Sequence, residues 1–136
     1  MLSIYSFLLP SFFLVVPPVT RLSVVEKDAV YKNIDEQWTV SCTSVGYPRP
    51  TITWRLNNMS LPAHVSRQEA AGGGDYLVEE AYSYLSIERL TAQDSGIFEC
   101  TGEINRLGTS RRSRQRVELR VLGMLIVTHC PLTQIF

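Results

Sequence analysis

The residues best suited to chemistry in this chain of 136 residues are three cysteines and two histidines. A structural zinc site needs about four such ligands at short, regular spacing. Cys130 directly follows His129, but no second pair accompanies them, and His64 stands alone. No serine or cysteine comes with a base and an orienting acid of the kind that nucleophilic catalysis requires. We therefore predict neither catalysis, nor a metal site, nor a cofactor.

A sequon for N-linked glycosylation, Asn58-Met59-Ser60, falls in a stretch of turn residues. An acceptor asparagine must lie on an exposed loop of an exported protein, and this position meets the first condition. The pattern predicts a glycan on Asn58 if the chain is secreted. The alternative is a chance tripeptide in a polar loop.

Arginines are concentrated between residues 101 and 120, where six of them stand against two glutamates in a chain of net charge +0. Arg112, Arg114, Arg116 and Arg120 share one parity, so an extended strand would point all four to one side. Such a row could bind a sulfated glycan or an acidic partner. The alternative is a solvated strand face that protects an edge from aggregation. The zero overall charge gives no attraction of the whole chain to nucleic acid or membrane.

Alternation of apolar and polar residues predicts that these side chains are carried by β-strands rather than helices. Gly, Pro, Asn and Asp separate the strands at 46–50, 57–62, 72–75 and 105–110. Many short strands with regular turns favour an antiparallel sandwich or barrel. Tyrosines at 76, 82 and 84 cluster just after the glycines at 72–74, and they are either ordinary strand residues or contact area for a partner. The apolar positions expected to face the core are Trp38, Val40, Cys42, Ile52, Trp54, Leu85, Ile87, Phe98, Cys100, Val117, Leu119 and Val121.

The two ends of the chain differ from the middle. Residues 1–16 are apolar or small and carry no charge. They are shorter than the ~20 residues of a membrane span and fit a secretory signal, although no basic residue precedes them and no A-x-A-like cleavage site follows. An uncleaved apolar leader or a mis-annotated first exon are the alternatives. Residues 123–136 are expected to be a disordered tail, with Cys130 as a free thiol or an intermolecular link.

The spacing of the other two cysteines favours the sandwich over the barrel. Cys42 and Cys100 are 58 residues apart, and Trp54 lies 12 residues after the first. A covalent bridge between two facing sheets, with a large aromatic packed against it, would fix the centre of a two-layer core. Closing a loop of this length would stabilise the fold by ~4 kcal/mol in the chain-entropy model.

These motifs together resemble the immunoglobulin superfamily, and in detail its I-set. "PPVTRL" resembles the opening strand, "GYPRPTITW" the approach to the core tryptophan, and "LSIERLTAQDSGIFEC" the approach to the second cysteine. The resemblance covers about residues 17–122. It implies an all-β, two-sheet antiparallel sandwich with one inter-sheet disulfide, Cys42–Cys100. The implied core includes Trp54, Leu85, Ile87 and Phe98.

The resemblance also assigns roles beside the second cysteine. Asp94 matches an aspartate that caps or pairs locally in the turn before its strand, with Arg67 or Arg89 as partner. Gly96 permits a close approach of backbone at this corner. Phe98 matches the corner tyrosine but lacks its hydroxyl, a hydrogen bond worth ~0.5–1.5 kcal/mol.

The function implied by the resemblance is non-catalytic recognition or cell adhesion outside the cell. The chain would be a fragment or a soluble form of a larger receptor or adhesion protein, with protein partners on cell surfaces or in the matrix. It would meet a membrane only through its leader or its parent protein. The alternative is an intracellular, filament-associated structural domain, in which both cysteines would stay reduced.

Overall fold

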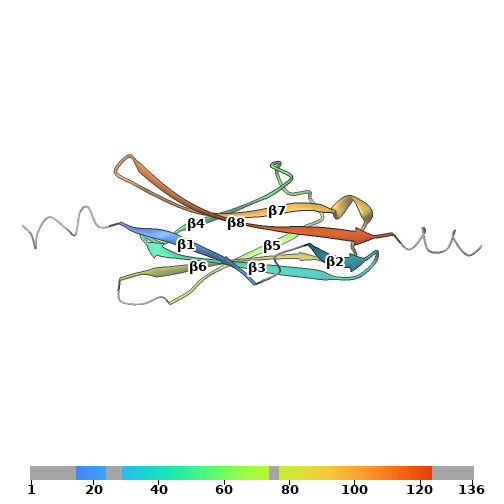
Figure 1. The fold of residues 1–136 in the computed structure, drawn as a ribbon. Helices are drawn as coiled ribbons and strands as arrows, with labels where there is room; N and C mark the ends of the chain where they lie inside the picture. Colours follow the sequence, from blue (N-terminus) through green and yellow to red (C-terminus); the bar gives the residue numbers. More distant parts are fainter. Residues whose placement is uncertain (1–14, 24–28, 74–76, 124–136) are drawn as a thin grey trace, which may run out of the picture.

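The computed structural model describes residues 15–23, 29–73 and 77–123. Within them two four-stranded sheets face each other, one in the order β1-β3-β6-β5 and the other in the order β2-β8-β7-β4 (Figure 1). The predicted all-β, two-sheet sandwich is confirmed. The elements are β1 (Val16–Leu22), β2 (Val30–Asn33), β3 (Trp38–Tyr47), β4 (Thr51–Leu56), β5 (Ser66–Ala71), β6 (Glu79–Ile87), the 3₁₀ helix η1 (Ala92–Asp94), β7 (Gly96–Arg106) and β8 (Thr109–Leu122).

The core lies between the sheets because apolar residues occupy most of the inward, alternate positions of β3, β4 and β6. In β3, β4 and β6 buried positions alternate with more exposed ones, as a pleated strand with one covered face requires. Leu85, Ile87 and Phe98 are completely buried, and Trp54 is 3% exposed. Phe98 packs against Trp38 with ring centroids 5.0 Å apart.

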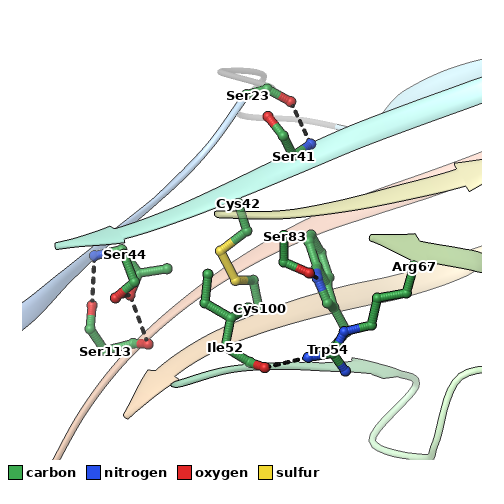
Figure 2. The surroundings of a disulfide bond; sticks show 11 residues. Ser23, Ser41, Cys42, Ser44, Ile52, Trp54, Arg67, Ser83, Cys100 and Ser113 are labelled. Atoms are coloured by element: carbon green, nitrogen blue, oxygen red, sulfur yellow. Dashed lines mark hydrogen bonds between the residues drawn. A yellow bond between two sulfur atoms is a disulfide. The ribbon is translucent and has the colours of Figure 1, made fainter. Parts of the chain in front are cut away.

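The disulfide joins the two sheets at the centre of this core (Figure 2). Cys42 comes from β3 and Cys100 from β7, and both are fully buried. Beside the bridge, the indole Nε1 of Trp54 in β4 donates a hydrogen bond of 2.9 Å to Oγ of Ser83 in β6. The disulfide and this buried hydrogen bond connect the two sheets at their centre, and further hydrogen bonds join β1 to β8, through Thr20 and Ser113, and β5 to β4, through Arg67 and the Ile52 carbonyl.

The alternation of apolar and polar residues does not predict two of the strands, β2 and β5. β2 has only four residues, too few for a periodic signal, and it pairs with β8 in parallel, unlike the antiparallel pairs of the remaining strands. β5 lies at the edge of its sheet, and all six of its residues are exposed. A strand with no buried face shows no apolar alternation, so nothing in its sequence marks it.

Several sequence features fall outside the described residues. These are residues 1–14 of the apolar leader, Tyr76, and the tail with His129 and Cys130. In the described ranges no helix has the length and hydropathy to cross a bilayer. The same ranges contain no group of three His, Cys, Asp or Glu side chains that could hold a metal ion.

Candidate interaction faces

The outer surface of β4, β7 and β8, here the charged face, collects most of the predicted arginines. Its outward side chains surround an open hollow of about 320 Å³. Register places them in rows across the strands, such as Arg55, Glu99 and Arg116 in one row and Thr53, Thr101 and Arg114 in the next. The residues lining the hollow are Thr53, Arg55, Asn58, Glu99, Thr101, Glu103, Arg112, Arg114 and Arg116.

Glutamates neutralise part of this row of arginines. Arg112 Nε lies 3.0 Å from Glu103, and Arg116 Nε lies 2.8 Å from Glu99. Hydrogen bonds from Ser110, first, and from Arg112 lower the pKa of Glu103 below its usual value. Arg114 has no ion pair among the described side chains. The face therefore keeps only a modest positive excess, from four arginines against two glutamates.

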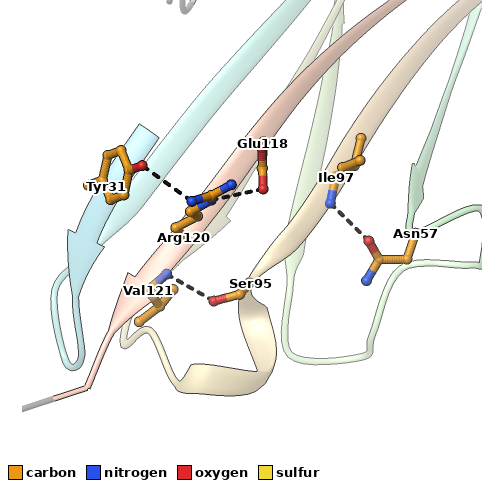
Figure 3. A network of polar contacts seen from close by, with 7 residues as sticks. All are labelled: Tyr31, Asn57, Ser95, Ile97, Glu118, Arg120 and Val121. Carbon is orange, nitrogen blue, oxygen red and sulfur yellow. Dashed lines mark hydrogen bonds and ion pairs between the residues drawn. The ribbon is translucent and has the colours of Figure 1, made fainter. Parts of the chain in front are cut away.

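Arg120 belongs to a separate cluster near the end of β8 (Figure 3). Its Nε lies 2.9 Å from Glu118, and its guanidinium stands 5.8 Å from the ring centre of Tyr31 on β2. The hydrogen bond and charge of Glu118 raise the pKa of Arg120 above its usual value. The predicted row of four arginines is thus divided into a group of three on the charged face and Arg120, which stands by itself.

The sequon lies at the rim of the charged face. Asn58 is exposed in the turn after β4, where both it and Asn57 adopt positive φ. Asn57 fixes this turn to β7, because its Oδ1 accepts a hydrogen bond of 2.9 Å from the backbone N–H of Ile97 (Figure 3). Gly96 allows this contact, since a Cβ there would lie 2.6 Å from the Asn57 side chain. The close approach expected at Gly96 is therefore made by a side chain.

The partner of Asp94 differs from the prediction. Its carboxylate is 1% exposed and accepts hydrogen bonds from the backbone N–H of Thr91 at 2.8 Å and from Nε2 of His64 at 2.5 Å. Local capping is therefore present, but neither predicted arginine takes part. Arg67 instead donates to the carbonyl of Ile52 on the edge strand β4 and pairs with Glu69, while Arg89 pairs with Asp35. No motif or spacing pointed to His64, which precedes β5 in an irregular turn.

The opposite surface, formed by β1, β3, β6 and β5, is here the tyrosine face. Tyr82 and Tyr84 stack with ring centroids 6.4 Å apart, and Tyr84 is 46% exposed. On the same face, two strands away on β1, Val19 is 55% exposed, and an open apolar groove of about 510 Å³ runs along β1. The Tyr82 hydroxyl donates to Glu80 at 3.2 Å, and this bond and the carboxylate charge raise the pKa of Tyr82.

Comparison with known proteins places these faces on a familiar scaffold. Residues 17–103 match the family model described as "Immunoglobulin domain". Mouse hemicentin-1 is 38% identical over 71 residues, 52% of this chain, and fruit-fly titin is 31% identical over 84 residues, 62% of this chain. The solved structure of the eight N-terminal Ig domains of Down Syndrome Cell Adhesion Molecule superposes with a TM-score of 0.59 at 21% identity, over 79% of this chain and 13% of that one.

The relatives are far longer than this chain. The match spans 1% of hemicentin-1 and, after rounding, 0% of titin. The similarity therefore concerns one domain and leaves the activity of the longer proteins aside.

Proposed function

The chain belongs to the immunoglobulin domain family, and on that premise we propose that it is a non-catalytic, extracellular recognition module of the cell-adhesion type. Its partners are proteins on cell surfaces or in the matrix. The relatives that it resembles include the chicken cell adhesion molecule DSCAML1. Fold alone does not fix function, so the surfaces and the redox state of the domain must support the proposal.

The buried Cys42–Cys100 bridge is the observation that carries the extracellular part of the proposal. Both sulfurs are completely excluded from solvent and tie the two sheets together. Disulfides of this structural kind persist in oxidising compartments and are rare in the cytosol. Export would also make Asn58 a glycosylated site, because its side chain is exposed in a turn.

Intact mass of the protein secreted from cultured animal cells, reduced and non-reduced and before and after glycosidase, tests this proposal. We expect an exported species with one internal disulfide and one glycan. An Asn58→Gln variant provides the control, since it should lose the glycan and keep the disulfide. A product that stays inside the cell, without glycan and with free thiols, would contradict the proposal.

A filament-associated structural domain is the second candidate, and the match to titin is compatible with it. In that setting Cys42 and Cys100 would stay reduced, and the sandwich would have to be stable without the bridge. Thiol labelling of the natural protein in cell extracts separates the two candidates. Full labelling of both cysteines after gentle unfolding would support the filament role.

We further propose that the module is a fragment or a soluble form of a longer protein. The relatives it matches contain far more chain than this domain provides. Transcripts that continue beyond the codon for Leu122 into further domains would support this. A lone, complete transcript would remove the idea.

Sulfated glycan is proposed as a ligand of the charged face only, with Arg114 at its centre. Arg112 and Arg116 already pair with glutamates, so Arg114 carries the uncompensated charge among these three arginines. Heparin-column retention should therefore drop in Arg114→Ser and persist in Arg89→Ser, which changes an exposed arginine elsewhere. Retention that is weak at low salt, or equal in both variants, would contradict this binding site.

A further inference from the structure

We propose that the tyrosine face binds the same face of a second copy of this domain, forming a weak symmetric dimer. The inference rests on the proposed recognition function, because it names one surface and one partner for it. It begins from a contrast between the two outer faces. The charged face carries ion pairs that are satisfied within the domain, whereas the tyrosine face offers aromatic and aliphatic area that the described residues leave uncovered.

The tyrosine face shares two features with interface cores, which are its low charge and its exposed tyrosine. Outward positions of β1, β3, β6 and β5 are mostly Val, Thr, Ser, Tyr and Ala, and only Arg21 and Glu80 among them are charged. Interface cores are enriched in tyrosine and poor in charge. Tyr84 and Val19, at 46% and 55% exposure, provide the area that would lose contact with water.

The positions of the two charges favour a second copy as the partner. Arg21 pairs in register with Thr43, and Glu80 pairs in register with Val45, so the two charges lie on opposite sides of β3. They are two strands and two residues apart, about 12 Å. In a dimer with the two tyrosine faces stacked, the two-fold axis lies in the plane between them. If this axis passes over the midpoint between the two charges and runs perpendicular to the line that joins them, Arg21 of each copy lies opposite Glu80 of the other. A self-complementary patch of this kind is what an isologous dimer requires.

The face is large enough for a weak dimer. Four strands about 4.8 Å apart and the nine residues of β6 give an area of about 500 Å². This is less than the ~800 Å² that each partner contributes to a stable interface, and it fits a transient contact. The glycan proposed at Asn58 would not interfere, since Asn58 borders the charged face on the other sheet.

Sedimentation of the secreted protein over a range of concentrations up to about millimolar tests the proposal. We expect a reversible monomer–dimer equilibrium that Tyr84→Glu abolishes. The control is Ile97→Glu, because Ile97 on β7 is equally exposed, at 46%, but lies on the other sheet. That variant should still dimerise. Both variants should still unfold cooperatively on heating, with Tyr84→Glu at a somewhat lower temperature because it loses the stack on Tyr82.

A charge exchange tests the two-fold geometry itself. Arg21→Glu and Glu80→Arg should each be monomeric, because like charges would meet at both contacts. Their mixture should form heterodimers, because each Glu of the first variant then meets an Arg of the second. A wild-type protein that stays monomeric, or a dimer insensitive to Tyr84→Glu, overturns the proposal. Failure of the mixture to associate overturns the symmetric arrangement.

Two further results separate this inference from the broader function. A monomeric protein that is still exported, glycosylated and oxidised would refute self-association and leave the recognition role intact. If Tyr84→Glu abolishes binding to cell surfaces but the domain never dimerises, the tyrosine face binds a different protein and the proposal is wrong.

Discussion

Replacing Ser83 by alanine should destabilise the domain more than any other loss of a single hydroxyl on β6. Ser83 is completely buried, and its Oγ accepts the hydrogen bond from the Trp54 indole at 2.9 Å. The substitution removes the hydrogen-bond acceptor of the Trp54 indole N–H beside the disulfide, and Trp54 is only 3% exposed, so water cannot replace it. An unsatisfied buried donor costs about 1–3 kcal/mol.

Urea unfolding followed by tryptophan fluorescence measures this cost. With a urea m-value of about 1.5 kcal/mol/M, a loss of about 2 kcal/mol lowers the unfolding midpoint by about 1.3 M. Ser86→Ala is the matched control, because Ser86 lies on the same strand with its side chain on the outer, half-buried side. It should change stability by less than about 0.5 kcal/mol.

A double-mutant cycle decides whether the hydrogen bond is the cause. In a Trp54→Phe background no indole N–H remains, so Ser83→Ala should then be neutral or slightly stabilising. An equal loss in both backgrounds would refute the reasoning and assign the effect to packing. A midpoint of Ser83→Ala within experimental error of the wild type would refute it as well.

Three further predictions concern the turn before β7, β7 itself and the hairpin that β7 forms with β8. Phe98→Tyr should be neutral or stabilising, since it restores a hydroxyl at this corner, and a clear drop in melting temperature would count against the corner assignment. His64→Ala should lower stability by about 1–3 kcal/mol in urea unfolding, because the buried Asp94 carboxylate loses a donor, and an unchanged midpoint would show that Thr91 suffices. Ser110→Ala should raise the pKa of Glu103 in a carbon-detected NMR titration, because it removes the hydrogen bond that lowers this pKa most. Because the pKa of Glu103 is lower in the folded than in the unfolded state, its interactions stabilise the fold above the unfolded pKa, and this stabilisation is lost as the pH falls through the folded pKa. The Ser110→Ala variant should therefore lose less stability on acidification than the wild type. An unchanged Glu103 titration would refute that cause.

The sequence alone determined the fold class and the centre of the domain. Alternating apolar residues at Leu85, Ile87 and Phe98 mark strands with one buried face, and this local pattern survives folding because the pleat has a period of two. The spacing of Cys42, Trp54 and Cys100 indicated two facing sheets, which the structure confirms. Such features depend on the order of residues along single strands.

Only the tertiary structure decided which side chains meet across strands. His64 rather than an arginine reaches Asp94, Ser83 satisfies Trp54, and Glu99 neutralises Arg116. Each contact joins different elements, over 17 to 30 residues of chain, so its partner depends on the register of the sheets and the path of the turns. Tyr82 and Tyr84 were predictable as contact area, but the extent of the tyrosine face was not, because strand parity tells which residues share a side and not which neighbouring strands complete the surface.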